Sequence, residues 1–304
     1  MNEDSEQFDA LPTEEACAGS RDLDLLDTKG MLEVINAEDQ KVALAVRKVI
    51  SDVALAVDAT AKKLLDGGHW HAFGAGTSGR IALLDAVECP PTFGVSHALF
   101  QGHMAGGMKA FTRAVEGAED TLELGIEAVA QANVRENDVV CAISASGRTP
   151  FCLGVLQEAK RRGVLTIAIA SNAKGPIIEA ADLGIAPATG PEVLTGSTRL
   201  KAGTAQKMIL NMISTGVMVK MGHTFGHLMV GVVPSNVKLR ARAHRLIEKL
   251  SGTSQGVSEA LESAGGDVRC AVLILRGKML APAALALMKR HQGSLRRAME
   301  EIQE

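Results

Sequence analysis

Two short turns of this 304-residue sequence carry hydroxyl side chains in a pattern suited to binding an anion. Each turn, FGAGTSGR and SASGRTP, follows an apolar run and precedes a segment with helical periodicity. Hydroxyl groups and unpaired backbone N–H groups at a helix N-terminus bind phosphate through hydrogen bonds and the helix dipole. A single such turn is no more than a helix cap, but two in tandem favour a phosphate site. The residues predicted to bind it are Gly76, Thr77, Ser78, Ser144, Ser146, Gly147 and Thr149.

The first turn also matches the dinucleotide fingerprint G-x-G-x-x-G at Gly74, Gly76 and Gly79. That fingerprint requires an acidic residue about 20 positions later, at the end of the next strand, to bind a ribose hydroxyl. The predicted strand there ends in LFQG and has no acid. A nucleotide-dependent oxidoreductase is therefore disfavoured, and no cofactor is expected.

The elements that position these turns alternate between two periodicities. Short apolar runs predict strands at 69–76, 95–102, 138–146, 164–171 and 183–189, with helical segments between them. Such alternation is typical of a parallel sheet covered on both faces, and both hydroxyl turns then lie at the carboxyl edge of the sheet. We predict an N-terminal arm and helix over 1–50, a sugar-phosphate-binding domain over 51–235 and a small helical subdomain over 236–304.

Composition limits the partners. The net charge is -3, aromatic residues make up 3% and Tyr is absent, so neither nucleic acid nor a membrane surface is expected to bind. The five scattered cysteines fit neither a disulfide framework nor a zinc site, and the acidic N-terminus lacks signal-peptide character. His223 and His227 lack an evident third ligand, so no metal is predicted. These features predict a cytoplasmic protein.

Longer motifs carry a family resemblance. The segments GAGTSGR and SASGRT resemble the sugar isomerase (SIS) fold, and LLDAVECPPTFG, AVEGAED and GPEVLTGSTRLKAGTAQKMILNMISTG resemble the N-acetylmuramic acid 6-phosphate etherase family. The resemblance implies an α/β fold: an SIS-type, doubly wound, parallel five-stranded sheet flanked by helices, with a small C-terminal helical subdomain. It also implies a lyase in amino-sugar and peptidoglycan recycling that yields N-acetylglucosamine 6-phosphate and D-lactate. Cys17 and Val87 stand where the family commonly has Asn and Ser.

By the same resemblance, Glu88 and Glu119 are the catalytic carboxylates. Once the sugar ring opens, the C2 proton is acidic, so elimination of lactate from C3 and syn addition of water need a base and an acid. Glu88 has apolar neighbours and two following prolines; we expect burial to raise its pKa and make it the acid. Glu119, in a polar stretch, is expected to be the ionised base, although the sequence leaves the roles exchangeable.

Two further residues, Glu192 and Lys201, lie in the most family-like segment and are predicted to line the substrate site. For Lys201 a helix-start charge is an equal alternative. A non-catalytic sugar-phosphate sensor similar to the glucokinase regulatory protein is the main competing function, and an aldose–ketose isomerase is another. Apolar helices near 30–65 and 202–221 predict a homodimer.

Overall fold

The chain forms two compact units, and the computed structural model describes residues 14–113, 115–232, 234 and 236–302. The first unit comprises residues up to Ala86 together with Ala98–Ile213, and the second comprises Val87–His97 and the residues from Ser214 onward. This division differs from the one expected at 50/51 and 235/236. One reason is that the segment Val87–His97 packs with the second unit, where the carbonyl oxygen of Phe93 lies 3.0 Å from His223 Nδ1.

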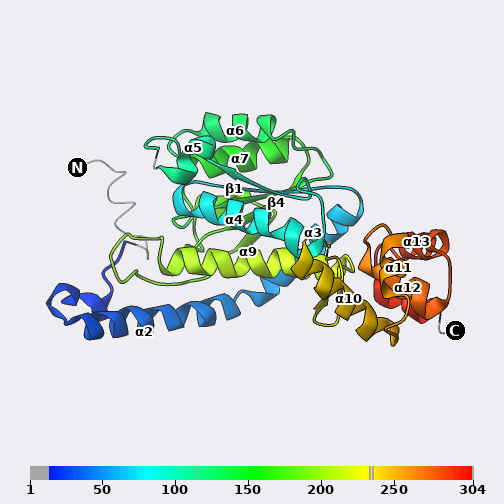
Figure 1. Cartoon of the computed structure of the whole chain (residues 1–304). Coiled ribbons are helices and arrows are strands. Elements are labelled where there is room, and N and C mark those ends of the chain that lie inside the picture. The colour runs from blue at the N-terminus through cyan, green and yellow to red at the C-terminus, as the bar shows by residue number, and fades with distance from the viewer. Residues whose placement is uncertain (1–13, 114, 233, 235, 303–304) are drawn as a thin grey trace. The chain divides into compact units, whose positions relative to one another are not determined.

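The first unit contains a five-stranded parallel sheet, which confirms the predicted fold class (Figure 1). The strands are β1 (Trp70–Gly74), β2 (Phe100–Met104), β3 (Val139–Ile143), β4 (Leu165–Ile169) and β5 (Leu183–Ile185), in the order β2-β1-β3-β4-β5. Only the second prediction is displaced, because β2 begins at Phe100 and not at residue 95. The strand order reverses between β1 and β3, and α/β proteins bind ligands outside the carboxyl ends of the strands at such a point.

Helices cover both faces of this sheet. The helices of this unit are α2 (Thr28–Arg47), α3 (Ile50–Leu65), α5 (Gly107–Thr112), α6 (Leu122–Gln131), α7 (Pro150–Arg161) and α8 (Pro176–Ala180), and α4 (Gly76–Phe93) and α9 (Lys201–Lys220) extend from it into the second unit. A buried cluster joins α7 to the side chains of Phe73 and Ala142 on one face. On the other face α4 crosses β2 closely, since a Cβ at Gly102 would lie 2.6 Å from the Leu83 Cα.

Glycines set the closest helix packing in the first unit. A Cβ placed on Gly125 of α6 would lie 2.0 Å from the Phe151 carbonyl oxygen, and one on Gly154 of α7 would lie 1.9 Å from that of Leu122. No other residue fits at either position without moving a helix. The two helices therefore pack backbone to backbone, which fixes the segment before α6 relative to the segment before α7.

A buried polar cluster crosses the edge of the sheet. His71 Nδ1 of β1 lies 3.1 Å from His103 Nε2 of β2, and His71 Nε2 lies 3.5 Å from the Asp138 carboxylate. Burial lowers the pKa of both histidines to about 4, which for His71 outweighs the opposite pull of Asp138. Both imidazoles are therefore neutral at physiological pH.

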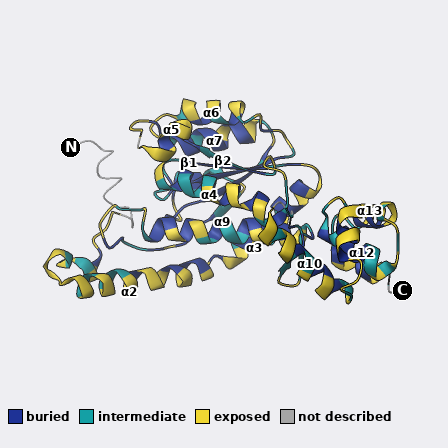
Figure 2. Ribbon diagram, viewed as in Figure 1, coloured by how far each residue is buried: buried dark blue, intermediate teal, exposed yellow. Residues whose placement is uncertain are grey.

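The second unit is mainly helical. Its elements are β6 (Thr224–Phe225), β7 (Leu228–Met229), α10 (Val237–Ser251), α11 (Val257–Ser263), α12 (Val268–Gly277), α13 (Ala281–Arg290) and α14 (Leu295–Glu301), with an apolar core of their own. Figure 2 shows this core, like the strands of the sheet, as buried, with the outward helix surfaces exposed. Within the described ranges, no single helix is long and apolar enough to cross a membrane; α12 and α13 meet that test of length and composition only as a pair bent by 114°.

Candidate functional site

The loop after β3 gathers two hydroxyl groups around that of a buried serine. Ser144 Oγ lies 2.8 Å from Thr149 Oγ1 and 3.3 Å from Ser146 Oγ, and it accepts a hydrogen bond of 3.1 Å from the Gly147 N–H. Gly147 has φ +74°, and a Cβ there would lie 3.0 Å from the Gly175 Cα, so the turn requires glycine. The serine oxygens also accept backbone N–H groups, and the three hydroxyls make two hydrogen bonds among themselves, which leaves one hydroxyl proton to donate to an anion.

The turn after β1 brings a helix N-terminus to the same edge of the sheet. Gly74 and Gly79 allow the strand and α4 to meet, because a Cβ on Gly79 would lie 2.6 Å from the Gly74 carbonyl oxygen. The first N–H groups of α4, at Gly76 to Ser78, have no partner within the helix and carry the positive end of its dipole. The Ser78 hydroxyl donates to Gln206 Oε1 at 2.9 Å, so this side chain also holds α9 against α4.

Both turns line one open cavity of about 330 Å³, which we call the hydroxyl pocket. Together with Glu119, six of the seven residues predicted to bind phosphate line it: Gly76, Thr77, Ser78, Ser144, Ser146 and Thr149. Gly147 shapes the turn between two of these residues. The structure thus brings the predicted phosphate-binding turns together at the point where the strand order reverses.

A backbone hydrogen bond holds Glu119 at the wall of this pocket. Its carbonyl oxygen accepts a hydrogen bond of 3.1 Å from the Phe151 N–H, at the start of the helix that follows the hydroxyl turn. Glu119 is exposed as a whole residue. The pKa of its carboxyl is nevertheless raised, first by partial desolvation and second by the negative charge of Asp120. The sequence predicts an ionised Glu119, and its role as the base stays a prediction.

Glu88 lies in the second half of α4, in the second unit. The helix continues through Pro90 and Pro91 to Phe93, with the Gly94 N–H bonded to the Pro90 carbonyl at 2.9 Å. The carboxyl end of this helix buries Cys89 and Pro90 but leaves Glu88 exposed. The predicted burial of Glu88 is therefore wrong, because the apolar neighbours and not the carboxylate face inward. About 18 Å of helical rise separates it from Gly76.

Comparisons with known proteins agree with this architecture. Family models described as the glucokinase regulatory protein N-terminal SIS domain and the SIS domain match residues 52–160 and 121–216. The chain is 47% identical over 292 residues to an N-acetylmuramic acid 6-phosphate etherase of Enterobacter sp. (strain 638), covering 96% of this chain and 98% of that relative. It is 43% identical over 293 residues to the etherase so named in Clostridium beijerinckii, covering 96% of each. The chain belongs to the N-acetylmuramic acid 6-phosphate etherase family.

In this etherase-family chain, the structure gives Glu192 and Lys201 partners within the protein. Both oxygens of the fully buried Glu192 carboxylate accept backbone N–H groups at the start of α9, from Lys201 and Ala202, at 2.9 Å each. The Lys201 ammonium is 1% exposed and lies 2.7 Å from the Glu38 carboxylate. Burial alone would raise the pKa of Glu38, but the hydrogen bonds and charges of Lys201 and Lys41 hold it at about 2. These contacts favour a structural role, and a substrate contact by either residue stays a prediction.

Sequence reasoning missed several residues that line the two cavities at this edge of the etherase-family sheet. Glu14 and Thr198 line the hydroxyl pocket, and Arg80 lines a neighbouring one. Glu14 ends the segment LPTE, and Arg80 ends the GAGTSGR turn. Their side chains were not assigned because neither spacing nor periodicity indicates where a loop residue returns to the sheet.

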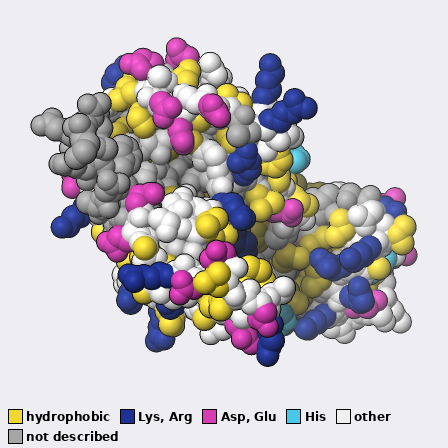
Figure 3. Space-filling view, turned by 90° about the vertical axis from the view of Figure 1, so that its left-hand side faces the viewer, with side chains coloured by type: hydrophobic (Ala, Val, Ile, Leu, Met, Phe, Trp, Pro, Cys, Tyr) yellow, Lys and Arg dark blue, Asp and Glu magenta, His cyan; other side chains and the backbone are white. Residues whose placement is uncertain are grey.

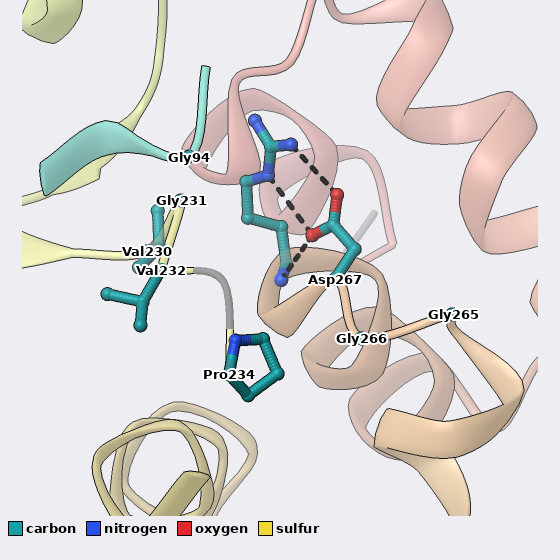
Figure 4. A pocket seen from close by; sticks show the side chains of 9 residues that line it. Gly94, Val230, Gly231, Val232, Pro234, Gly265, Gly266 and Asp267 are labelled. Atoms are coloured by element: carbon teal, nitrogen blue, oxygen red, sulfur yellow. Dashed lines mark hydrogen bonds and ion pairs between the residues drawn. The ribbon is translucent and has the colours of Figure 1, made fainter. Parts of the chain in front are cut away.

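A separate cavity of about 320 Å³ lies in the second unit of this etherase-family chain (Figure 4). Asp267 caps α12 and holds the Arg269 guanidinium through contacts of 2.8 and 3.1 Å, so the charges at this cavity neutralise each other. No predicted site residue lines it. Across the described part of the chain, no group of three or more His, Cys, Asp or Glu side chains is arranged to hold a metal ion.

Proposed function

We propose that this chain cleaves the D-lactyl ether of N-acetylmuramic acid 6-phosphate. One observation carries the proposal: a carboxylate with a raised pKa, Glu119, lies on the wall of the hydroxyl pocket. On the face drawn in Figure 3, Lys and Arg side chains are interspersed with Asp and Glu, so an anionic substrate depends on local donors and not on a broad positive field. The hydroxyl turns supply such donors for the phosphate.

The chemistry proceeds from the open-chain aldehyde. Glu119 takes the C2 proton, the C3–O bond breaks with its electron pair on the lactate oxygen, and a C2=C3 double bond forms. The sequence prediction assigns the protonation of this oxygen to Glu88; because that residue lies about 18 Å of helical rise from Gly76 and lines neither pocket, this role stays a prediction. Water then adds its oxygen to C3 and a proton to C2, on the same face. A raised pKa suits Glu119, since a carboxylate is a stronger base when its proton affinity is higher. This route makes the enzyme a carbon–oxygen lyase, acting in the cytoplasm.

The test is D-lactate release from N-acetylmuramic acid 6-phosphate by the purified chain. In water labelled with ¹⁸O, we expect the label at C3 of the N-acetylglucosamine 6-phosphate formed; an isomerase would leave C3 unlabelled. Glu119→Gln should reduce release about 10²- to 10⁴-fold. The matched control is Glu123→Gln, an exposed carboxylate on the first turn of α6, which should keep parental activity.

If the chain is a non-catalytic sugar-phosphate sensor, these experiments should give a different result. In that case N-acetylglucosamine 6-phosphate would bind, but no D-lactate would appear, and Glu119→Gln would change nothing that can be measured as turnover. Loss of both binding and release in Ser144→Ala with full activity of Glu119→Gln would contradict the proposed base.

We also propose that the chain forms a homodimer through α2 and α3. Leu32, Leu44 and Leu55 on these helices are 55%, 60% and 57% exposed, an apolar surface that a second copy of the chain would cover. The other helix expected at this surface, α9, instead buries Ala205 and Ile209. Light scattering at micromolar concentration should give twice the chain mass of 31.9 kDa, and Leu44→Glu should reduce it.

A further inference from the structure

A second cavity of about 210 Å³ adjoins the hydroxyl pocket, and we call it the arginine pocket. Ala75, Gly76 and Glu119 line both cavities, so the catalytic candidate stands where they meet. The rest of the wall is mostly apolar, with Met104, Ala105, Ala110, Val115 and Ala118, and it also includes Glu116. A group reacting at Glu119 therefore has a small, largely apolar space beside it.

Arg80 supplies the positive charge of this pocket. Its guanidinium donates from Nε to the Phe111 carbonyl oxygen at 3.0 Å and from Nη2 to that of Ala110 at 2.7 Å. These neutral carbonyls fix the plane of the guanidinium at the end of α5 but do not compensate its charge. Among the residues that the structure describes, no carboxylate lies within 4.0 Å of its nitrogens. The Nη1 donors and the second Nη2 proton thus form an edge suited to a bidentate carboxylate.

The loop that completes the pocket is built by glycines. Gly106 has φ +80°, and a Cβ there would lie 3.1 to 3.3 Å from Ala110, Val115 and Ala118. The apolar wall therefore folds tightly around this glycine, while Arg80 ties the end of α5 to α4. Tight packing around Gly106 therefore shapes this side of the cavity.

We infer that the arginine pocket binds the D-lactyl group of the substrate and that Arg80 recognises its carboxylate. The inference rests on the proposed function and deepens it. A lactyl group has one carboxylate and one methyl group, which match one guanidinium and an apolar wall. With the phosphate at the hydroxyl turns, this placement puts the ether oxygen beside Glu119, between the pockets. Arg80 is then the residue that distinguishes the ether substrate from N-acetylglucosamine 6-phosphate, which lacks the lactyl group.

The test compares two ligands in two variants, Arg80→Gln and Val115→Phe. Arg80→Gln keeps a donor for the α5 carbonyls but removes the charge; Val115→Phe narrows the pocket at a residue that is 45% exposed, where folding tolerates substitution. We expect KM for N-acetylmuramic acid 6-phosphate to rise about 10- to 100-fold in Arg80→Gln, the loss typical of a charge-assisted hydrogen bond. The inhibition constant of N-acetylglucosamine 6-phosphate should change less than about threefold on the same scale.

The outcomes separate this inference from the function on which it rests. If the parent releases no D-lactate, the proposed function fails. If the parent is active and Arg80→Gln weakens both ligands equally, Arg80 only caps α5 and the inference alone fails. If Arg80→Gln does not fold, an unchanged ratio of the two constants in Val115→Phe overturns the lactyl assignment, and a selective rise in KM supports it.

Discussion

Removing the carboxylate of Glu38 should strongly destabilise the first unit. Glu38→Gln leaves the Lys201 ammonium, which is 1% exposed and 2.7 Å from Glu38 Oε2, without its anion. The lysine must then remain charged in a buried site or give up its proton, and either costs free energy. Lys41 is the second partner of Glu38, at 2.5 Å, and its side chain is 60% exposed. Loss of this exposed ion pair should cost little free energy, because water solvates the lysine charge.

The structure sets the size of the effect. Breaking a buried ion pair by removing one partner costs about 3–5 kcal/mol. The pKa of Glu38 falls from 4.5 to about 2 in the folded chain, which corresponds to about 3 kcal/mol. The folded pKa is depressed, so this stability is present above pH 4.5 and is lost as the pH falls towards 2. We therefore expect Glu38→Gln to lower the free energy of unfolding by about 3 kcal/mol at pH 7.

Urea unfolding followed by the emission of Trp70 measures this change. Trp70 is the only tryptophan, is 2% exposed and lies in β1, so it reports on the first unit. Lys41→Met is the matched control and should cost less than about 1 kcal/mol. The double variant Glu38→Leu with Lys201→Met should recover most of the loss. A Glu38→Gln variant as stable as the parent, or a Lys201→Met variant that keeps full stability but loses substrate binding, would refute the structural role of this pair.

Three further predictions follow from the same geometry. Because burial lowers the pKa of His71 and His103 to about 4, stability should be full above pH 6.5 and fall towards pH 4; for His71 alone the loss between pH 7.5 and pH 5 is about 2 kcal/mol, measurable by urea unfolding. Gly154→Ala should destabilise by about 1–3 kcal/mol or more, seen as a lower Tm, since its Cβ would lie 1.9 Å from the Leu122 carbonyl oxygen. Ser144→Ala should weaken N-acetylglucosamine 6-phosphate binding at least about 10-fold in calorimetry, whereas an unchanged affinity would place the phosphate elsewhere.

The sheet and both hydroxyl turns were predictable because local signals determine them. Buried parallel strands read as apolar runs, and the carboxyl ends of such strands share one edge, so SASGRT and GAGTSGR had to meet. The displaced start of β2 shows the limit of this reasoning: residues 95–99 mix apolar Val, Ala and Leu with Ser96 and His97, and only the pairing of Trp70 with Phe100 sets the register.

The burial and partners of single charged residues were not predictable. The sequence around Glu88 is apolar, yet the residue is exposed. Whether a helical residue is buried depends on the face of the helix on which it lies, and adjacent residues in the sequence lie on different faces. Lys201 pairs with Glu38 from a helix 163 positions earlier in the chain, and no local pattern records such a contact. Arg80 binds backbone carbonyl oxygens. Every residue has such a group, so no sequence motif indicates which carbonyls an arginine will bind.

The position of Glu119 depends on residues that take no part in chemistry. Its carbonyl oxygen binds the Phe151 N–H, so the catalytic candidate is attached to the helix that begins at the hydroxyl turn. The packing of α6 on α7 through Gly125 and Gly154 then prevents the two segments from sliding relative to each other. Phosphate binding and proton transfer are thus held in register by backbone contacts between two helices. It follows that a methyl group added at Gly154, far from any ligand, should lower turnover more than phosphate binding, because a displacement of about 1 Å matters more to proton transfer than to a flexible hydroxyl donor.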